Sequence, residues 1–167
     1  MAGPVNLAAK KIVARLGLEP LPQEGGFFRQ TWVSAAQVAP GRAAGSAIWF
    51  LLTPDSFSAW HRVASEELWH FHAGDPVEHL QLDPRLRTVV RTVLGAGVLA
   101  GQRPQLVVPG GTWQAARLRT GARRRGWALL GCTLTPAWDE REFQLGRRAE
   151  LSRRFPAAQA LIQALTR

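Results

Sequence analysis

Three of the four histidines lie between positions 61 and 72, and this stretch carries the strongest chemical signal in the sequence. His61 precedes Glu67, and His70 and His72 follow shortly after. Imidazole titrates near neutral pH, so a histidine beside a carboxylate can take up and return a proton. The same two groups are also ligands for divalent transition metals. The residue types therefore predict an acid–base pair, His61 and Glu67, or a metal site.

The spacing within this stretch separates the histidines into two groups. Side chains alternate between the two faces of a β-strand. If residues 68–72 form a strand, Glu67 and Trp69 share one face, while His70 and His72 share the other. We therefore expect His70 and His72 to point away from Glu67, toward a second layer or a subunit interface.

The elements that position these residues are mostly short strands. Apolar and β-branched runs alternate with Gly, Pro and Asp turns, a pattern typical of a sandwich or barrel. Helical spacing occurs only near the two ends, and 40–45 reads as a loop. The predicted helices are 5–18, 149–155 and 157–165. The predicted strands are 27–33, 46–52, 58–63, 68–72, 77–82, 89–94, 105–108, 113–118 and 127–134. The sequence predicts a single all-β domain spanning 1–167.

Composition narrows the functional classes. The formal net charge is +9, and all but Lys10 and Lys11 of the 21 basic residues are Arg. Most of these charges are scattered, and Arg123–Arg125 reads as a solvated loop, so a nucleic-acid site is not favoured. No apolar run is long enough for a signal or membrane segment, which favours a cytoplasmic protein. Cys132 is the single cysteine, and we expect it to be a buried core thiol.

Two spaced motifs resemble those of the cupin superfamily. The first superfamily motif has two His, a Glu and a Gly, and the second has Pro, Gly and His. This sequence keeps both spacings, with Val and Gln in place of two of the histidines. The matching positions are His61, Val63, Glu67, Gly74, Pro109, Gly111 and Gln114.

A narrower resemblance, to an uncharacterised single-domain branch of the Cupin-five type, covers nearly the whole chain. It implies a double-stranded β-helix, or jelly-roll barrel, with a short N-terminal helix and C-terminal helices. It also implies a likeness to nucleotide-sugar epimerases that need no metal, and a homodimer; the branch has no assigned activity. The segments that carry it are 16–28, 48–53, 58–63, 67–71, 74–76, 108–116 and 131–136.

The resemblance also assigns roles to residues. His61, Glu67 and Gln114 would be the ligands of any metal, but Val63 cannot coordinate and an amide oxygen is a weak ligand. A metal-free pocket is therefore favoured, with a divalent transition metal as the alternative. The residues expected to contact a small-molecule ligand are Gln114, Phe28, Arg29, Trp49 and Trp69.

Three functions remain open at this point. The first is a metal-independent isomerase or epimerase of a sugar-like or nucleotide-sugar-like substrate, with His61 as base and Glu67 as partner. The chain has no Tyr, so it cannot copy an epimerase that uses Tyr as the acid. The second is a non-catalytic small-molecule binding module, and the third is a weakly metal-dependent enzyme.

Overall fold

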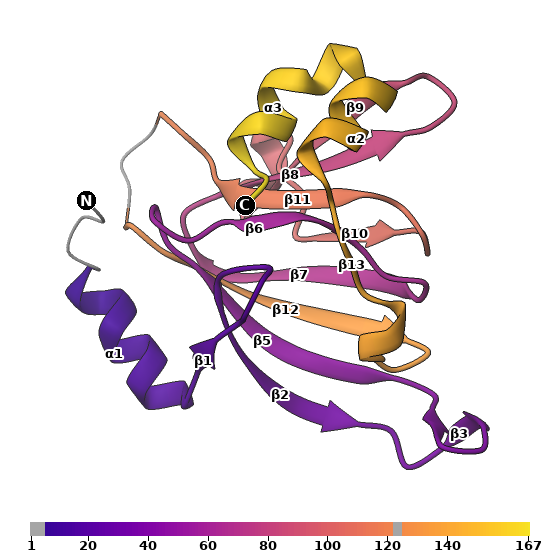
Figure 1. The fold of residues 1–167 in the computed structure, drawn as a ribbon. Helices are drawn as coiled ribbons and strands as arrows, with labels where there is room; N and C mark the ends of the chain where they lie inside the picture. Colours follow the sequence, from indigo (N-terminus) through magenta and orange to yellow (C-terminus); the bar gives the residue numbers. More distant parts are fainter. Residues whose placement is uncertain (1–5, 122–124) are drawn as a thin grey trace.

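The computed structural model describes residues 6–121 and 125–167, so most of the predicted loop at Arg123–Arg125 lies outside the described residues. Two antiparallel sheets make up most of the fold (Figure 1). The six-stranded sheet runs β1 (Glu19–Pro20), β2 (Phe27–Val33), β5 (Ser46–Leu52), β12 (Ala128–Thr135), β7 (Glu66–Gly74), β10 (Gln105–Val108). The five-stranded sheet runs β13 (Gln144–Leu145), β6 (Ser58–Arg62), β11 (Gln114–Leu118), β8 (Val77–Asp83), β9 (Thr88–Leu94).

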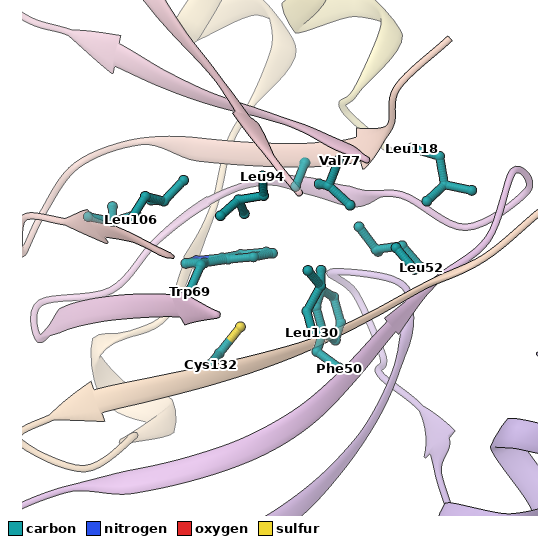
Figure 2. Close-up of a cluster of buried hydrophobic side chains, with 12 residues drawn as sticks. Phe50, Leu52, Trp69, Val77, Leu94, Leu106, Leu118, Leu130 and Cys132 are labelled. Carbon is teal, nitrogen blue, oxygen red and sulfur yellow. The ribbon is translucent and has the colours of Figure 1, made fainter. Parts of the chain in front are cut away.

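The space between the two sheets holds one hydrophobic core. Alternate residues of each strand point into it, as the pleat of a strand requires. Trp69 from β7 and Phe50 from β5 pack edge to face with ring centroids 5.7 Å apart. Figure 2 shows these side chains with Leu130 and Cys132 from β12 and Leu94 from β9. The core thus fixes which side chain of each strand faces inward.

Helices cover the outer face of each sheet. α1 (Leu7–Leu16) lies against the six-stranded sheet, where Ala9 packs with Leu51, and it ends at Gly17 in the left-handed conformation. α2 (Arg148–Arg154) and α3 (Gln159–Ala164) lie against the five-stranded sheet. Leu151 and Ile162 from these helices form a second hydrophobic cluster with residues on the outer face of that sheet. Short 3₁₀ turns occupy Val98–Ala100, Glu140–Glu142 and Pro156–Ala158.

The jelly-roll prediction is confirmed, with two separate sheets that form a sandwich rather than a closed barrel. The predicted strands are all present, with ends shifted by at most two residues. The expected loop at 40–45 instead contributes to a small hairpin, β3 (Gln37–Ala39) and β4 (Arg42–Ala43), around a turn at Gly41 with φ of 73°. Strands of two or three residues are too short to show alternation. No helix within the described residues has both the length and the apolarity needed to span a bilayer.

Candidate functional site

A cavity of about 640 Å³ lies at one end of the sandwich. Its walls come from β1, β2, β5, β7 and β12 of the large sheet, from β6 of the small sheet, and from two connecting segments, 21–24 and 138–143. His61 and Glu67, which are far less exposed than the rim, both line it. The structure therefore places the predicted acid–base pair in the wall of one cavity.

The hydrogen bonding of His61 fixes which ring nitrogen can act as a base. Nδ1 lies 2.8 Å from the carbonyl oxygen of Ala59, which can only accept, so Nδ1 carries the proton in the neutral ring. Nε2 then has the lone pair and makes no hydrogen bond with any residue that the structure describes. The ring is 3% exposed and stacks on Phe143, with centroids 5.6 Å apart. The contact with Ala59 and the stacking on Phe143 thus orient the ring with Nε2 toward the cavity.

Glu24 completes this end of the cavity and was not among the residues that sequence reasoning selected. Its Oε1 accepts a hydrogen bond from Ser58 Oγ at 2.7 Å and lies 3.9 Å from His61 Nε2. Gly25 and Gly26 follow with φ of 102° and 80°, a backbone region that favours glycine. The Gly pair marks this segment as unusual in the sequence, but it does not reveal that Glu24 turns toward His61.

Glu67 sits deeper, with 7% of its surface exposed. Burial raises the pKa of this carboxyl, because a charged form loses its hydration; the positive charge that His61 can carry opposes the shift. Gln114 Nε2 donates to Glu67 Oε2 and orients the group. The Glu67 carboxyl therefore keeps its proton to a higher pH than an exposed glutamate does.

Gln114 belongs to a buried network behind the cavity rather than to its lining. Its Oε1 accepts from Trp69 Nε1 at 3.1 Å and from His79 Nε2 at 3.0 Å. Trp69 is 1% exposed, so it too is part of the core. Gln114 and Trp69 were both predicted as ligand contacts, and the structure instead has them supporting Glu67 from behind.

His79 carried no special signal in the sequence, yet it is fully buried within this network. Its Nδ1 has no hydrogen-bond partner among the described residues. Burial lowers the pKa of His79 to about 4, so the ring stays neutral at physiological pH. The neutral ring can donate one proton from Nε2 to Gln114.

The other predicted ligand contacts divide between the two faces of the large sheet. Phe28 lines the cavity. Arg29 and Trp49 lie on the opposite face, because they alternate with Phe28 and Phe50 along their strands. Arg29 Nη1 donates to the carbonyl of Leu16 at the end of α1, and Trp49 packs in the α1 cluster. The structure therefore does not bring Arg29 or Trp49 to the cavity.

His70 and His72 follow the alternation expected from the sequence. His70 Nε2 lies 3.3 Å from Thr133 Oγ1, and His70 Nδ1 lies 3.1 Å from Gln105 Nε2. His72 Nε2 lies close to the backbone of Gly131, on the same outer face. The burial pattern of β7 places Glu67 and Trp69 on the buried face. Neither histidine is part of the cavity.

The segment between β12 and β13 closes one side of the cavity, and no sequence pattern had indicated it. Trp138, Glu140 and Phe143 line the cavity. Arg42 holds the segment in place through Asp139 at 2.9 Å and Glu142 at 2.6 Å. Such a contact joins residues about 100 positions apart, which local patterns cannot predict.

The residues present do not fit the metal site of cupins. Gln114 Oε1 already accepts two hydrogen bonds and is absent from the cavity lining, and Val63 offers no donor atom. Within residues 6–121 and 125–167, no three His, Cys, Asp or Glu side chains are arranged to hold a metal ion. Cys132 lines the cavity, but burial raises the pKa of its thiol well above the usual range, which disfavours the thiolate.

Comparison with solved structures identifies close relatives of the whole fold. A hypothetical protein from Leishmania major is 32% identical, with a TM-score of 0.87 over 95% of this chain and 98% of its own. A protein from Shewanella oneidensis is 31% identical, with a TM-score of 0.87 over 95% of this chain and 97% of its own.

More distant structures share the fold alone. A cupin 2 conserved barrel domain protein from Rhodopseudomonas palustris is 18% identical, with a TM-score of 0.56 over 90% of this chain and 89% of its own. Among curated proteins, none matches this chain.

The model of the family described as "Cupin superfamily (DUF985)" matches residues 10–146. The chain therefore belongs to the Cupin_5 family of the cupin superfamily.

Proposed function

We propose that this protein is a metal-independent isomerase of a small polyhydroxy carbonyl compound, with His61 as the general base and Glu67 as the general acid. The observation that carries the proposal is the Nδ1 contact of His61 with the Ala59 carbonyl. That contact leaves the Nε2 lone pair in the same cavity as the buried carboxyl of Glu67, whose pKa is raised by burial.

The proton transfers balance without a metal or a redox partner. His61 Nε2 takes the proton from the carbon next to the carbonyl, and the electron pair of that C–H bond forms a carbon–carbon double bond. Glu67 gives its proton to the carbonyl oxygen, which yields an enediol. The Glu67 carboxylate then removes the proton of the neighbouring hydroxyl, and His61 returns its proton to the former carbonyl carbon.

The surroundings support each step. The carboxylate of Glu24, 3.9 Å from His61 Nε2, stabilises the imidazolium that forms after proton abstraction. The Gln114 amide remains hydrogen-bonded to Glu67 and keeps it oriented. Glu67 also supplies the acid in a chain that has no Tyr.

Deuterium exchange tests the proposal. The protein is incubated in D₂O with a panel of aldoses and ketoses, and proton NMR follows loss of the proton next to the carbonyl together with product formation. We expect exchange by the wild type, and a rate at least about 100-fold lower in His61→Gln and Glu67→Gln, because a positioned general acid or base contributes roughly this much.

His72→Gln is the matched control, because this histidine lies on the outer face and its replacement leaves the cavity intact. Its rate should equal that of the wild type. Sugars that bind the cavity without any exchange would overturn the proposal and indicate a non-catalytic binding module. Exchange that persists in His61→Gln would assign the base to another residue.

A further inference from the structure

The charged side chains that line the cavity are acidic, although the chain as a whole is basic. The chain carries 21 Lys and Arg against 12 Asp and Glu, yet no described Lys or Arg lines this cavity. A separate cavity, behind β6, has the opposite character, with three arginines in its wall. The charged and titratable residues that line the proposed active site are Glu19, Glu24, His61, Glu67 and Glu140.

These carboxylates also lack cationic partners of their own. In the described part of the chain, none of the four forms an ion pair with Lys or Arg, and Glu24 approaches only His61. Glu24 Oε1 accepts from Ser58, whereas its Oε2 accepts no hydrogen bond from any described residue. A carboxylate oxygen that lines a cavity without a donor is a ready acceptor for a ligand.

His61 gives the second and independent indication of a ligand. Its ring is almost completely buried, and Nε2 faces the cavity without a hydrogen bond. Nε2 in this tautomer is an acceptor, as is Glu24 Oε1 at 3.9 Å. The part of the cavity beside His61 and Glu24 thus presents two neighbouring acceptors, which an anionic group cannot satisfy.

Aromatic rings surround the same space. Phe28 and Phe50 lie on one wall, and Phe143 and the half-exposed Trp138 lie on another. The face of an aromatic ring carries partial negative charge and attracts cations, an effect that strengthens where water is excluded. Carboxylates and ring faces together favour a positively charged organic group.

We infer that the substrate carries an ammonium group, as an amino sugar does, and that Glu24 is its anchor. The inference deepens the proposed function, because it assigns a chemical class to the molecule on which His61 and Glu67 act. A nucleotide-linked sugar would instead place a diphosphate beside Glu19, Glu24 and Glu140, in a cavity that no described Lys or Arg lines, at a large electrostatic cost.

Isothermal titration calorimetry at pH 7 with three related sugars tests the inference. Glucosamine, glucose and glucuronate share a pyranose ring and differ in charge. We expect glucosamine to bind at least about 10-fold more tightly than glucose, and glucuronate to bind more weakly than glucose. Equal affinities, or tightest binding of glucuronate, would overturn the inference.

Glu24→Gln should reduce the preference for glucosamine over glucose to less than about 3-fold, because the amide keeps the shape but not the charge. Glu66→Gln is the matched control, because Glu66 is exposed and outside the cavity lining, and it should keep the wild-type preference. An unchanged preference in Glu24→Gln would remove Glu24 as the anchor.

Binding and turnover separate the two proposals. Selective binding of glucosamine without deuterium exchange of any sugar would overturn the isomerase and leave the charge preference standing. Exchange with neutral or anionic sugars, without a preference for the amine, would overturn the charge preference and leave the isomerase standing.

Discussion

At the scale of single residues, the site is defined by which atoms already have partners. The Ala59 carbonyl occupies Nδ1 of His61, and Ser58 occupies one oxygen of Glu24. Gln114 has both ends of its amide engaged, which removes it from ligand binding. A residue whose hydrogen-bonding atoms all have partners supports the site, whereas a residue with an atom that lacks a partner is available to a ligand.

His79 makes the buried network sensitive to acid. Its pKa is about 6.5 in an unfolded chain and about 4 when buried, so the unfolded chain binds more protons between these values. The contribution of neutral His79 to folding stability is therefore fully present above pH 6.5 and is lost as the pH falls from 6.5 through 4. The shift corresponds to about 3 kcal/mol between pH 7 and pH 4.

Urea unfolding of the wild type and His79→Gln at pH 7 and pH 4 measures this contribution. The glutamine cannot titrate, so we expect the wild type to lose about 3 kcal/mol more than the variant over this range. Other titrating groups are common to both proteins and cancel in the difference. Equal losses in the two proteins would show that His79 is accessible to protons in the folded state.

At the scale of elements, the cavity depends on segments that lie outside the two main sheets. The β3–β4 hairpin supplies Arg42, which pairs with Asp139 and Glu142 and thereby holds Trp138 and Phe143 over the cavity. Hydrogen bonds from Arg141 also lower the pKa of Asp139, which keeps it ionised as a partner for Arg42. A small hairpin thus shapes the site without touching it.

Arg42→Gln should loosen this segment. We expect a lower free energy of unfolding, because one guanidinium that is only 17% exposed holds both carboxylates. Hydrogen exchange of residues 138–143 should become faster than in the wild type. Arg91→Gln is the control: it removes an ion pair with Glu78 in the small sheet, and its side chain is 55% exposed, so hydrogen exchange of residues 138–143 should match the wild type. Unchanged exchange in Arg42→Gln would mean that packing alone holds the segment.

At the scale of the whole molecule, the two sheets make one inner surface and two outer ones. α2 and α3 cover the outer face of the small sheet, and α1 covers the large sheet near β2, β5 and β12 (Figure 1). His72 and Val107 remain exposed on the outer side of β7 and β10. The homodimer implied by the family resemblance stays a prediction.

Sedimentation velocity measures the oligomeric state directly. We expect a species of twice the 18.3 kDa chain mass at micromolar concentration. Val107→Glu would place a charge on the exposed outer face and should shift the protein toward the monomer if that face pairs. A wild-type monomer at all concentrations would contradict the prediction.

Residue patterns in the sequence determined an all-β sandwich or barrel, the positions of its longer strands, and the separation of His61 and Glu67 from His70 and His72. The jelly roll itself was what the family resemblance implied. The patterns that predict strands and the faces of their side chains depend on the local alternation of residues, which does not require contacts with distant parts of the chain. The sequence also singled out Phe28. The same alternation would have excluded Arg29 and Trp49 from the cavity if the sequence had shown which face of their strands points inward.

Only the tertiary structure decided what lies around His61. Glu24, Trp138 and Phe143 reach the cavity from segments without regular patterns. Gln114, which His79 contacts within the small sheet, meets Trp69 and Glu67 across the two sheets. The absence of Lys and Arg from the described cavity lining is likewise invisible in a chain of net charge +9. Burial, hydrogen-bond saturation and local charge depend on contacts between residues far apart in sequence, so they are settled by packing rather than by composition or spacing.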